Sequence, residues 1–199
     1  MQNKKLLIGI GAVVVVLLLM VLGSYNSLVQ KDQAVAKSWA QVEADYQRRS
    51  DLVPNLVSTV KGAAAFESNT LLAVTEARAK ATSIQIDPSK LTAENIAAYE
   101  KAQSGLSGAL GKLLAISENY PALTATESFR GLQTQLEGTE NRIAVSRKDF
   151  NTAVQSYNVS TKTFPNALFA SLFASLFGFA PKDYFVAEEG SAAAPEVNF

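Results

Sequence analysis

An uninterrupted apolar run near the N-terminus constrains this chain more than any other feature. Residues 6–23 (LLIGIGAVVVVLLLMVLG) contain no charged side chain. A helix rises about 1.5 Å per residue, so the run would be about 27 Å long, close to the ~30 Å hydrocarbon core of a bilayer. The run is therefore long enough to be a transmembrane anchor.

The flanks of this run favour an anchor that is retained. A cleaved signal peptide has an apolar region of roughly 7–15 residues and a small-residue cleavage site. Gly23-Ser24 is the candidate for such a site, and cleavage remains the alternative. No cysteine follows, which excludes a lipoprotein. The basic flank 1–5 carries Lys4 and Lys5, and no charge follows the run until Lys31, so we expect a single-pass protein with an extracytoplasmic body.

Composition excludes most enzyme classes. The chain has no cysteine and no histidine, which rules out Ser-His-Asp triads, thiolate nucleophiles and imidazole or thiolate metal sites. Once Lys4 and Lys5 are set aside, 16 basic residues face 18 acidic ones without a basic stripe, so nucleic acid is not an expected partner. Glu67, Glu118 and Glu140 are candidates for carboxylate chemistry or an oxygen-ligand metal site. Any helical bundle of this size has as many carboxylates, so we predict no enzyme activity, cofactor or metal.

The body beyond the anchor has a helical period throughout. Its first apolar stripe is interrupted at Arg48–Asp51, shortly before Pro54. A break with Asp51 as N-cap places Pro54 in a first helical turn, where proline costs little. The unbroken phase of the stripe favours one long kinked helix instead. We expect the break, because it gives four helices joined by short connections. The first stripe comprises Val35, Trp39, Val42, Tyr46, Val53, Leu56 and Val60.

Three further helices follow in the sequence. The second is expected to end near Ser83, and the third to begin near Thr92. Thr124 and Glu127 have the spacing of a capping box, which opens the longest helix. The sequence therefore predicts an all-α protein, in which an antiparallel four-helix bundle over residues 24–165 follows the transmembrane helix.

A second apolar segment follows the predicted bundle at residues 166–185. The 14 residues 167–180 (ALFASLFASLFGFA) carry no charge and are too few to span a bilayer. Every face of a helix here would be apolar or small, which favours a short C-terminal helix that contacts lipid or a partner, with docking onto the bundle as the alternative. The tail 186–199 is predicted to be disordered. The interface candidates are Leu168, Phe169, Leu172, Phe173, Leu176 and Phe177.

Four charged residues form a candidate polar motif. Arg49 falls on the core phase of the first stripe, and Glu140 and Arg142 flank the stripe of the longest helix. Together with Asp51, they are expected to form cross-helix ion pairs or caps that fix register, with ligand recognition as the alternative.

Three glycines could be mistaken for a phosphate-binding loop. Gly105, Gly108 and Gly111 lie within a helical period, and no strand precedes them. We therefore predict that they allow close helix packing.

A set of short motifs, taken together, resembles the LemA family of bacterial membrane-anchored helical proteins. The resemblance covers roughly residues 24–185 and implies a helical bundle on one transmembrane helix in the bacterial envelope, without an established activity. One branch of that family is associated with magnetosome membranes, and others occur alongside membrane peptidases or TPM-domain proteins. The chain departs from the pattern where Leu168-Phe-Ala-Ser171 is repeated as Leu172-Phe-Ala-Ser175. The motifs are Tyr25-Asn26-x-Leu28-Val29, Trp39-Ala-Gln-Val42, Arg48-Arg49-Ser-Asp51-Leu-Val-Pro54-Asn55-Leu56-Val57, Glu118-Asn-Tyr120-Pro121, Thr139-Glu140-Asn141-Arg142-Ile143-Ala144, Asn158 and Phe164-Pro165.

These observations favour a non-enzymatic, membrane-anchored scaffold in the bacterial cytoplasmic membrane. Its expected partners are membrane lipid, further copies of the chain and other envelope proteins. The alternative is an accessory or sensing subunit of an envelope protease or stress system, with the polar end around Arg49, Asp51 and Glu140 contacting the partner. A carboxylate-based hydrolase that uses Glu118 or Glu140 is the weaker alternative.

Overall fold

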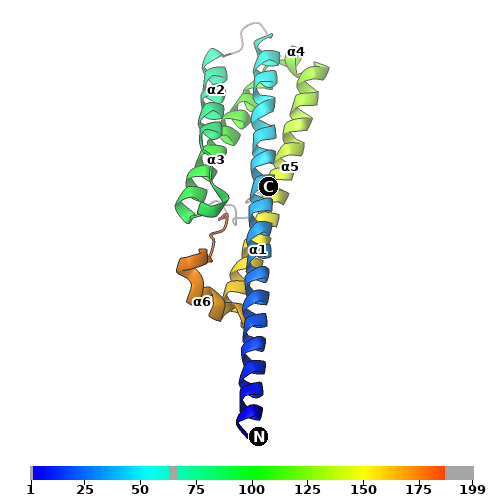
Figure 1. The fold of residues 1–199 in the computed structure, drawn as a ribbon. Helices are drawn as coiled ribbons and strands as arrows, with labels where there is room; N and C mark the ends of the chain where they lie inside the picture. The colour runs from blue at the N-terminus through cyan, green and yellow to red at the C-terminus, as the bar shows by residue number, and fades with distance from the viewer. Residues whose placement is uncertain (1, 63–66, 187–199) are drawn as a thin grey trace, which may run out of the picture.

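The computed structural model describes residues 2–62 and 67–186, and this part of the chain is helical without strands (Figure 1). The elements are the helices α1 (Gln2–Lys61), α2 (Ser68–Ser83), α3 (Ala93–Ser117), α4 (Pro121–Thr124), α5 (Glu127–Lys162) and α6 (Asn166–Phe177), with a 3₁₀ turn at Pro88–Lys90. Residues 178–186 follow α6 without regular secondary structure, and we call them the strap. The predicted disordered tail lies outside the described residues, apart from Val186.

Helix α1 is one continuous helix of 60 residues, so the break expected at Ser50-Asp51 is wrong. Pro54 lies inside α1 and has no N–H to donate to the carbonyl of Ser50, four residues back. Arg78 of α2 supplies the missing donor, because its Nε lies 2.8 Å from the Ser50 oxygen. A contact from a second helix thus satisfies the carbonyl that the proline leaves free.

The later helix ends follow local capping chemistry. Helix α2 ends at Ser83 and α3 begins at Ala93, close to the positions that the sequence predicts. The Thr92 hydroxyl caps α3 by accepting the N–H of Asn95. The N-cap of α5 is Thr126, whose hydroxyl accepts the N–H of Phe129, so the capping box expected from Thr124 is wrong. Thr124 instead closes the short helix α4, which is not among the helices expected from the sequence.

The long helices enclose two separate apolar cores. Helices α1 and α5 pack along their shared length, while α2 and α3 pair with each other beside the C-terminal half of α1 (Figure 1). The distal core contains Val53, Leu56, Val60, Leu71, Val74, Ala81, Leu106, Leu110, Leu113, Leu123, Phe129 and Leu136. The proximal core lies nearer the N-terminal end and contains Leu28, Val35, Trp39, Val42, Tyr46, Ile86, Leu91, Ile96, Tyr99, Ile143, Phe150, Val154, Tyr157, Phe169, Ala170, Phe179 and Phe185.

The N-terminal part of α1 extends beyond the other described helices, and its side chains are exposed. Among the described residues, α1 is the one helix long and apolar enough to cross a membrane. Of its most apolar stretch of 18 residues, 6% is buried. The large side chains from Leu7 to Leu22 are exposed, whereas Leu28 is fully buried. The expected boundary between anchor and body, at residues 23 and 24, therefore lies within a single unbroken helix.

The glycines of α3 do not mediate helix packing. Gly105, Gly108 and Gly111 are exposed, and a Cβ added at any of them would meet no atom within 4 Å. The predicted close packing is therefore wrong, because these glycines lie on the face of α3 that points away from its neighbours.

Candidate functional site

Helix α6 packs beside α1 just beyond the apolar run. Tyr25 lies two residues after the run, and its ring lies 6.1 Å from the ring of Phe169 in an edge-on contact. Helix α6 contacts both α1 and α5 in this region (Figure 1). Since two residues of helix rise about 3 Å, α6 lies directly at the end of the predicted membrane span.

The outer face of α6 presents apolar side chains to solvent. Leu168 and Leu172 are 57% and 73% exposed and lie four residues apart, on one helical face. We call these two residues the α6 surface. Phe169 is 5% exposed and belongs to the proximal core, so its prediction as an interface residue is wrong. The side chains of Phe173, Leu176 and Phe177 lie outside the described set.

Two asparagines of α5 hold the strap by its backbone. Asn158 donates to the carbonyl of Lys182 at 2.8 Å and accepts its N–H at 2.9 Å. Asn151 makes the same pair of bonds to Phe185, at 3.0 and 2.9 Å. The two asparagines are seven residues apart, which is about 10.5 Å along a helix, and their partners are three residues apart, which is about 10 Å along an extended chain. The two spacings therefore match. The strap therefore runs antiparallel to α5 in a fixed register.

Side chains of the strap connect three helices. Lys182 forms an ion pair with Asp32 of α1 at 3.0 Å, and its ammonium lies 5.4 Å from the centre of the Tyr157 ring. Burial raises the pKa of Tyr157 to about 12, and the Asp32 carboxylate adds to the rise. The carboxylate of Asp183 accepts the N–H of Ala93, in the first turn of α3.

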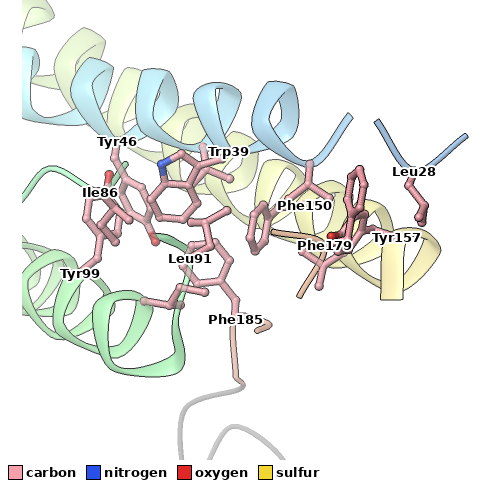
Figure 2. Close-up of a cluster of buried hydrophobic side chains, with 14 of the residues drawn as sticks. Leu28, Trp39, Tyr46, Ile86, Leu91, Tyr99, Phe150, Tyr157, Phe179 and Phe185 are labelled. Carbon is pink, nitrogen blue, oxygen red and sulfur yellow. The ribbon is translucent and has the colours of Figure 1, made fainter. Parts of the chain in front are cut away.

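The ring of Phe185 completes the proximal core. It stacks on Trp39 of α1 with the ring planes 17° apart and the centroids at 5.7 Å. Figure 2 shows both residues in the cluster, together with Phe150. The Arg147 guanidinium lies 4.8 Å from the centre of the same ring and pairs with Glu100 of α3. The strap is thus a structural part of the body. Docking onto the helices is the alternative that the sequence leaves open for this segment, whereas contact with lipid or a partner is the expectation it favours.

Arg49 joins three helices through a buried network. Its side chain is 1% exposed, and one terminal nitrogen bonds Glu140 of α5 at 2.8 Å and Ser107 of α3. The other bonds both the side-chain oxygen and the carbonyl of Gln103, at 2.8 and 3.0 Å. Gln103 in turn donates to the carbonyl of Ala81 in α2. This network ties all four long helices together at the boundary between the two cores.

The other members of the predicted polar motif lie apart from this network. Asp51 is exposed and accepts a bond from Gln47, one turn earlier in α1, at 2.7 Å. Arg142 is exposed on α5, next to a shallow groove that Asp45 and Asp149 also line. The structure therefore brings together Arg49 and Glu140, without Asp51 or Arg142.

The carboxylates considered for metal binding or hydrolysis are also dispersed. Glu67 precedes α2, Glu118 follows α3, and Glu140 pairs with Arg49 from the middle of α5. Within residues 2–62 and 67–186, no group of three acidic, histidine or cysteine side chains is arranged to hold a metal ion.

These features define a class: all-helical membrane proteins in which one N-terminal helix serves as both apolar anchor and core element. Residues 38–199 match the model of the LemA family, so the chain belongs to the LemA family. It is 28% identical over 178 residues to the magnetosome protein MamQ of Magnetospirillum gryphiswaldense, covering 81% of this chain and 64% of that protein. It is 22% identical over 142 residues to protein LemA of Metamycoplasma hominis, covering 71% of this chain and 61% of that protein. The chain thus spans under two thirds of these relatives.

Proposed function

We propose that this protein is a non-enzymatic, membrane-anchored scaffold that self-associates at the membrane surface through the α6 surface. The proposal places one transmembrane span in the bacterial cytoplasmic membrane and the helical body, expected to be a four-helix bundle, on its extracytoplasmic side. Docking onto other envelope proteins is the second mode of action that such a surface allows.

The observation that carries the proposal is that α6, with its exposed α6 surface, packs beside the continuous helix α1 just beyond the apolar run. Because α1 runs without interruption from the apolar run into both cores, the anchor fixes the height and tilt of the body above the bilayer. Tyr25 and α6 lie at the level of the lipid head groups in this arrangement, where aromatic residues are favoured. Exposed apolar side chains at that level gain free energy when lipid or a second copy covers them.

The family supports a membrane role without naming a reaction. Relatives of this chain include proteins named as magnetosome proteins, and we extend to this chain only a role in a bacterial membrane structure. Neither the Arg49 network nor the dispersed carboxylates favours an enzyme or a docking site at the polar end. The accessory-subunit alternative predicts that Arg49→Glu leaves the fold intact and abolishes a partner contact.

The test compares the mass of the full-length protein in lipid nanodiscs or native-like vesicles, by crosslinking and by mass photometry. We expect the wild-type protein to form ordered oligomers and the double variant Leu168→Ser/Leu172→Ser to remain a single copy. Leu72→Ser is the matched control, because Leu72 is 58% exposed on α2, and Figure 1 shows α2 and α6 at different ends of the helical body. A wild-type protein that is a single copy, or a double variant with unchanged oligomers, would overturn self-association.

A further inference from the structure

A cavity opens between α1, the end of α2, the connection to α3, and α3 itself. Its volume is about 470 Å³, within the range of roughly 300–1,000 Å³ typical of small-molecule sites. The lining includes Glu43, Tyr46 and Ser50 of α1 together with Thr82 and Tyr99. Among the described residues that line it, one is acidic and none is basic.

Glu43 is the one charged group in this cavity, and it has no cation beside it. Its carboxylate forms no ion pair with any residue of the described chain. Partial burial raises its pKa, and the indole N–H of Trp39 opposes that rise only in part. Trp39 Nε1 itself is buried without a partner at hydrogen-bonding geometry. The site therefore holds a carboxylate that forms no ion pair within residues 2–62 and 67–186.

Two aromatic rings face the same space. Tyr46 and Tyr99 both line the cavity, and their rings meet edge to face at 5.4 Å (Figure 2). Aromatic faces attract ammonium and guanidinium groups, most strongly where water is excluded. Burial raises the pKa of both hydroxyls, so both tyrosines stay neutral at physiological pH and offer rings and hydroxyls rather than a competing charge.

We propose that this cavity, which we call the Glu43 cavity, binds a small organic cation with an ammonium or guanidinium head group. The carboxylate of Glu43 pairs with the head group, the ring of Tyr99 packs on it, and polar side chains such as Gln85 bond the remainder of the molecule. The Tyr46 ring already holds the Arg49 guanidinium 5.0 Å from its centre, so it contributes to the wall of the cavity. The inference is independent of the scaffold proposal, since the cavity lies on α1, α2 and α3 and not at α6.

The single tryptophan of the chain provides the readout. Trp39 packs on the Tyr99 ring with centroids 5.3 Å apart, so a ligand against Tyr99 changes its emission. The full-length protein in nanodiscs is titrated with n-pentylammonium and with agmatine, and 1-pentanol and pentanoate serve as neutral and anionic controls. We expect saturable quenching by both cations, and none by the alcohol or the anion.

Removing the charge of Glu43 should abolish most of this binding. A hydrogen-bonded charge contributes enough for Glu43→Gln to weaken binding of both cations about tenfold or more. Glu76→Gln is the matched control, because Glu76 is an exposed acid of α2 that does not line the cavity, and it should bind as the wild type does.

A second pair of variants tests the site without altering Glu43. Thr82 and Thr75 are exposed on α2, and each donates its hydroxyl to the carbonyl four residues earlier, but only Thr82 lines the cavity. Thr82→Lys places an ammonium beside Glu43 and should block the ligand, whereas Thr75→Lys should not. Equal binding of pentylammonium and pentanol, unchanged affinity in Glu43→Gln, or absence of any quenching in the wild type would overturn the proposal.

Discussion

The proximal and distal cores are closed by different parts of the chain. The distal core is mainly aliphatic and is built by successive elements from the second half of α1 to the start of α5. The proximal core is rich in aromatic rings, and its last ring, Phe185, returns from the far end of the chain to stack on Trp39. Contacts so distant in sequence form only after a long loop has closed. The distal core should therefore be the more autonomous of the two, and the proximal core the more dependent on the strap.

The largest expected effect tests the junction between the two cores. Arg49→Ala removes four hydrogen bonds and leaves the buried side-chain oxygen of Gln103 without its donor, so we expect a loss of about 3 kcal/mol in unfolding free energy. The adjacent Arg48 is exposed, and Arg48→Ala should stay within about 0.5 kcal/mol of wild type. Chemical denaturation measures both variants, and equal effects would mean that the network contributes no stability.

The next prediction concerns Asn158, the buried residue that holds the backbone of the strap. Asn158→Ala removes both bonds to the backbone of Lys182 and should cost about 2 kcal/mol. Hydrogen exchange should show the loss of protection in the proximal core, around Trp39, with the distal core around Leu106 unchanged. The exposed Asn141 provides the control variant Asn141→Ala. Equal loss of protection in both cores would contradict their separate closure.

The third prediction concerns the proline of α1 and the arginine that accommodates it. Arg78→Ala should cost about 1–2 kcal/mol, because it leaves the carbonyl of Ser50 without a donor. In a Pro54→Ala background the backbone N–H of residue 54 can bond that carbonyl, so the same substitution should cost less than half as much. A double-mutant cycle measures this coupling, and additive effects would show that Arg78 does not compensate for the proline.

A stabilising change is expected on the outer face of α3. Gly108→Ala should raise the unfolding free energy by about 0.5–1 kcal/mol, because the helix gains propensity and the added Cβ meets open space. Thermal denaturation measures the gain, and Gly178→Ala is the opposite control, since Gly178 has a φ of 70° that disfavours a side chain. Loss of stability in Gly108→Ala would indicate that a partner covers this face.

The smallest expected effect is the pH dependence of Glu43. Its folded pKa is raised by burial, so the folded state binds the proton more tightly than the unfolded state. The carboxylate therefore costs stability above its folded pKa, and this cost disappears as the pH falls through that pKa. Glu43→Gln should be slightly more stable than wild type at pH 7, and the difference should shrink towards pH 4. Urea denaturation at the two pH values measures it, and a constant difference would contradict a desolvated carboxylate.

Local signals in the sequence predicted much of this fold. The apolar run, the helical period, the end of α2 at Ser83 and the start of α3 near Thr92 depend on neighbouring residues, so they could be recognised without the structure. The break expected at Ser50-Asp51 was wrong because the donor that compensates for Pro54, Arg78, lies on another helix. Local sequence patterns do not predict a contact between side chains and backbone of two different helices.

The candidate sites were predicted less well, and for the same reason. The core phase of Arg49 indicated a buried pairing, but its partners Gln103 and Ser107 depend on the placement of α3. The strap was missed, although Asn151 and Asn158 stand seven residues apart beside the apolar stripe of α5, which was the signal available. The Glu43 cavity is formed by three helices and left no motif in the sequence.

The central claim is that α1 carries the body directly from the bilayer and holds the α6 surface at the head groups. Because the chain has no cysteine, a spin label can be attached at one chosen position, through Leu172→Cys or, as the control, Leu72→Cys. Power-saturation electron paramagnetic resonance in lipid vesicles then compares access of oxygen and of a water-soluble nickel complex to each label. The account predicts that the label at 172 lies at the bilayer interface and the label at 72 lies in water. A label at 172 with the same water access as the label at 72 would contradict it.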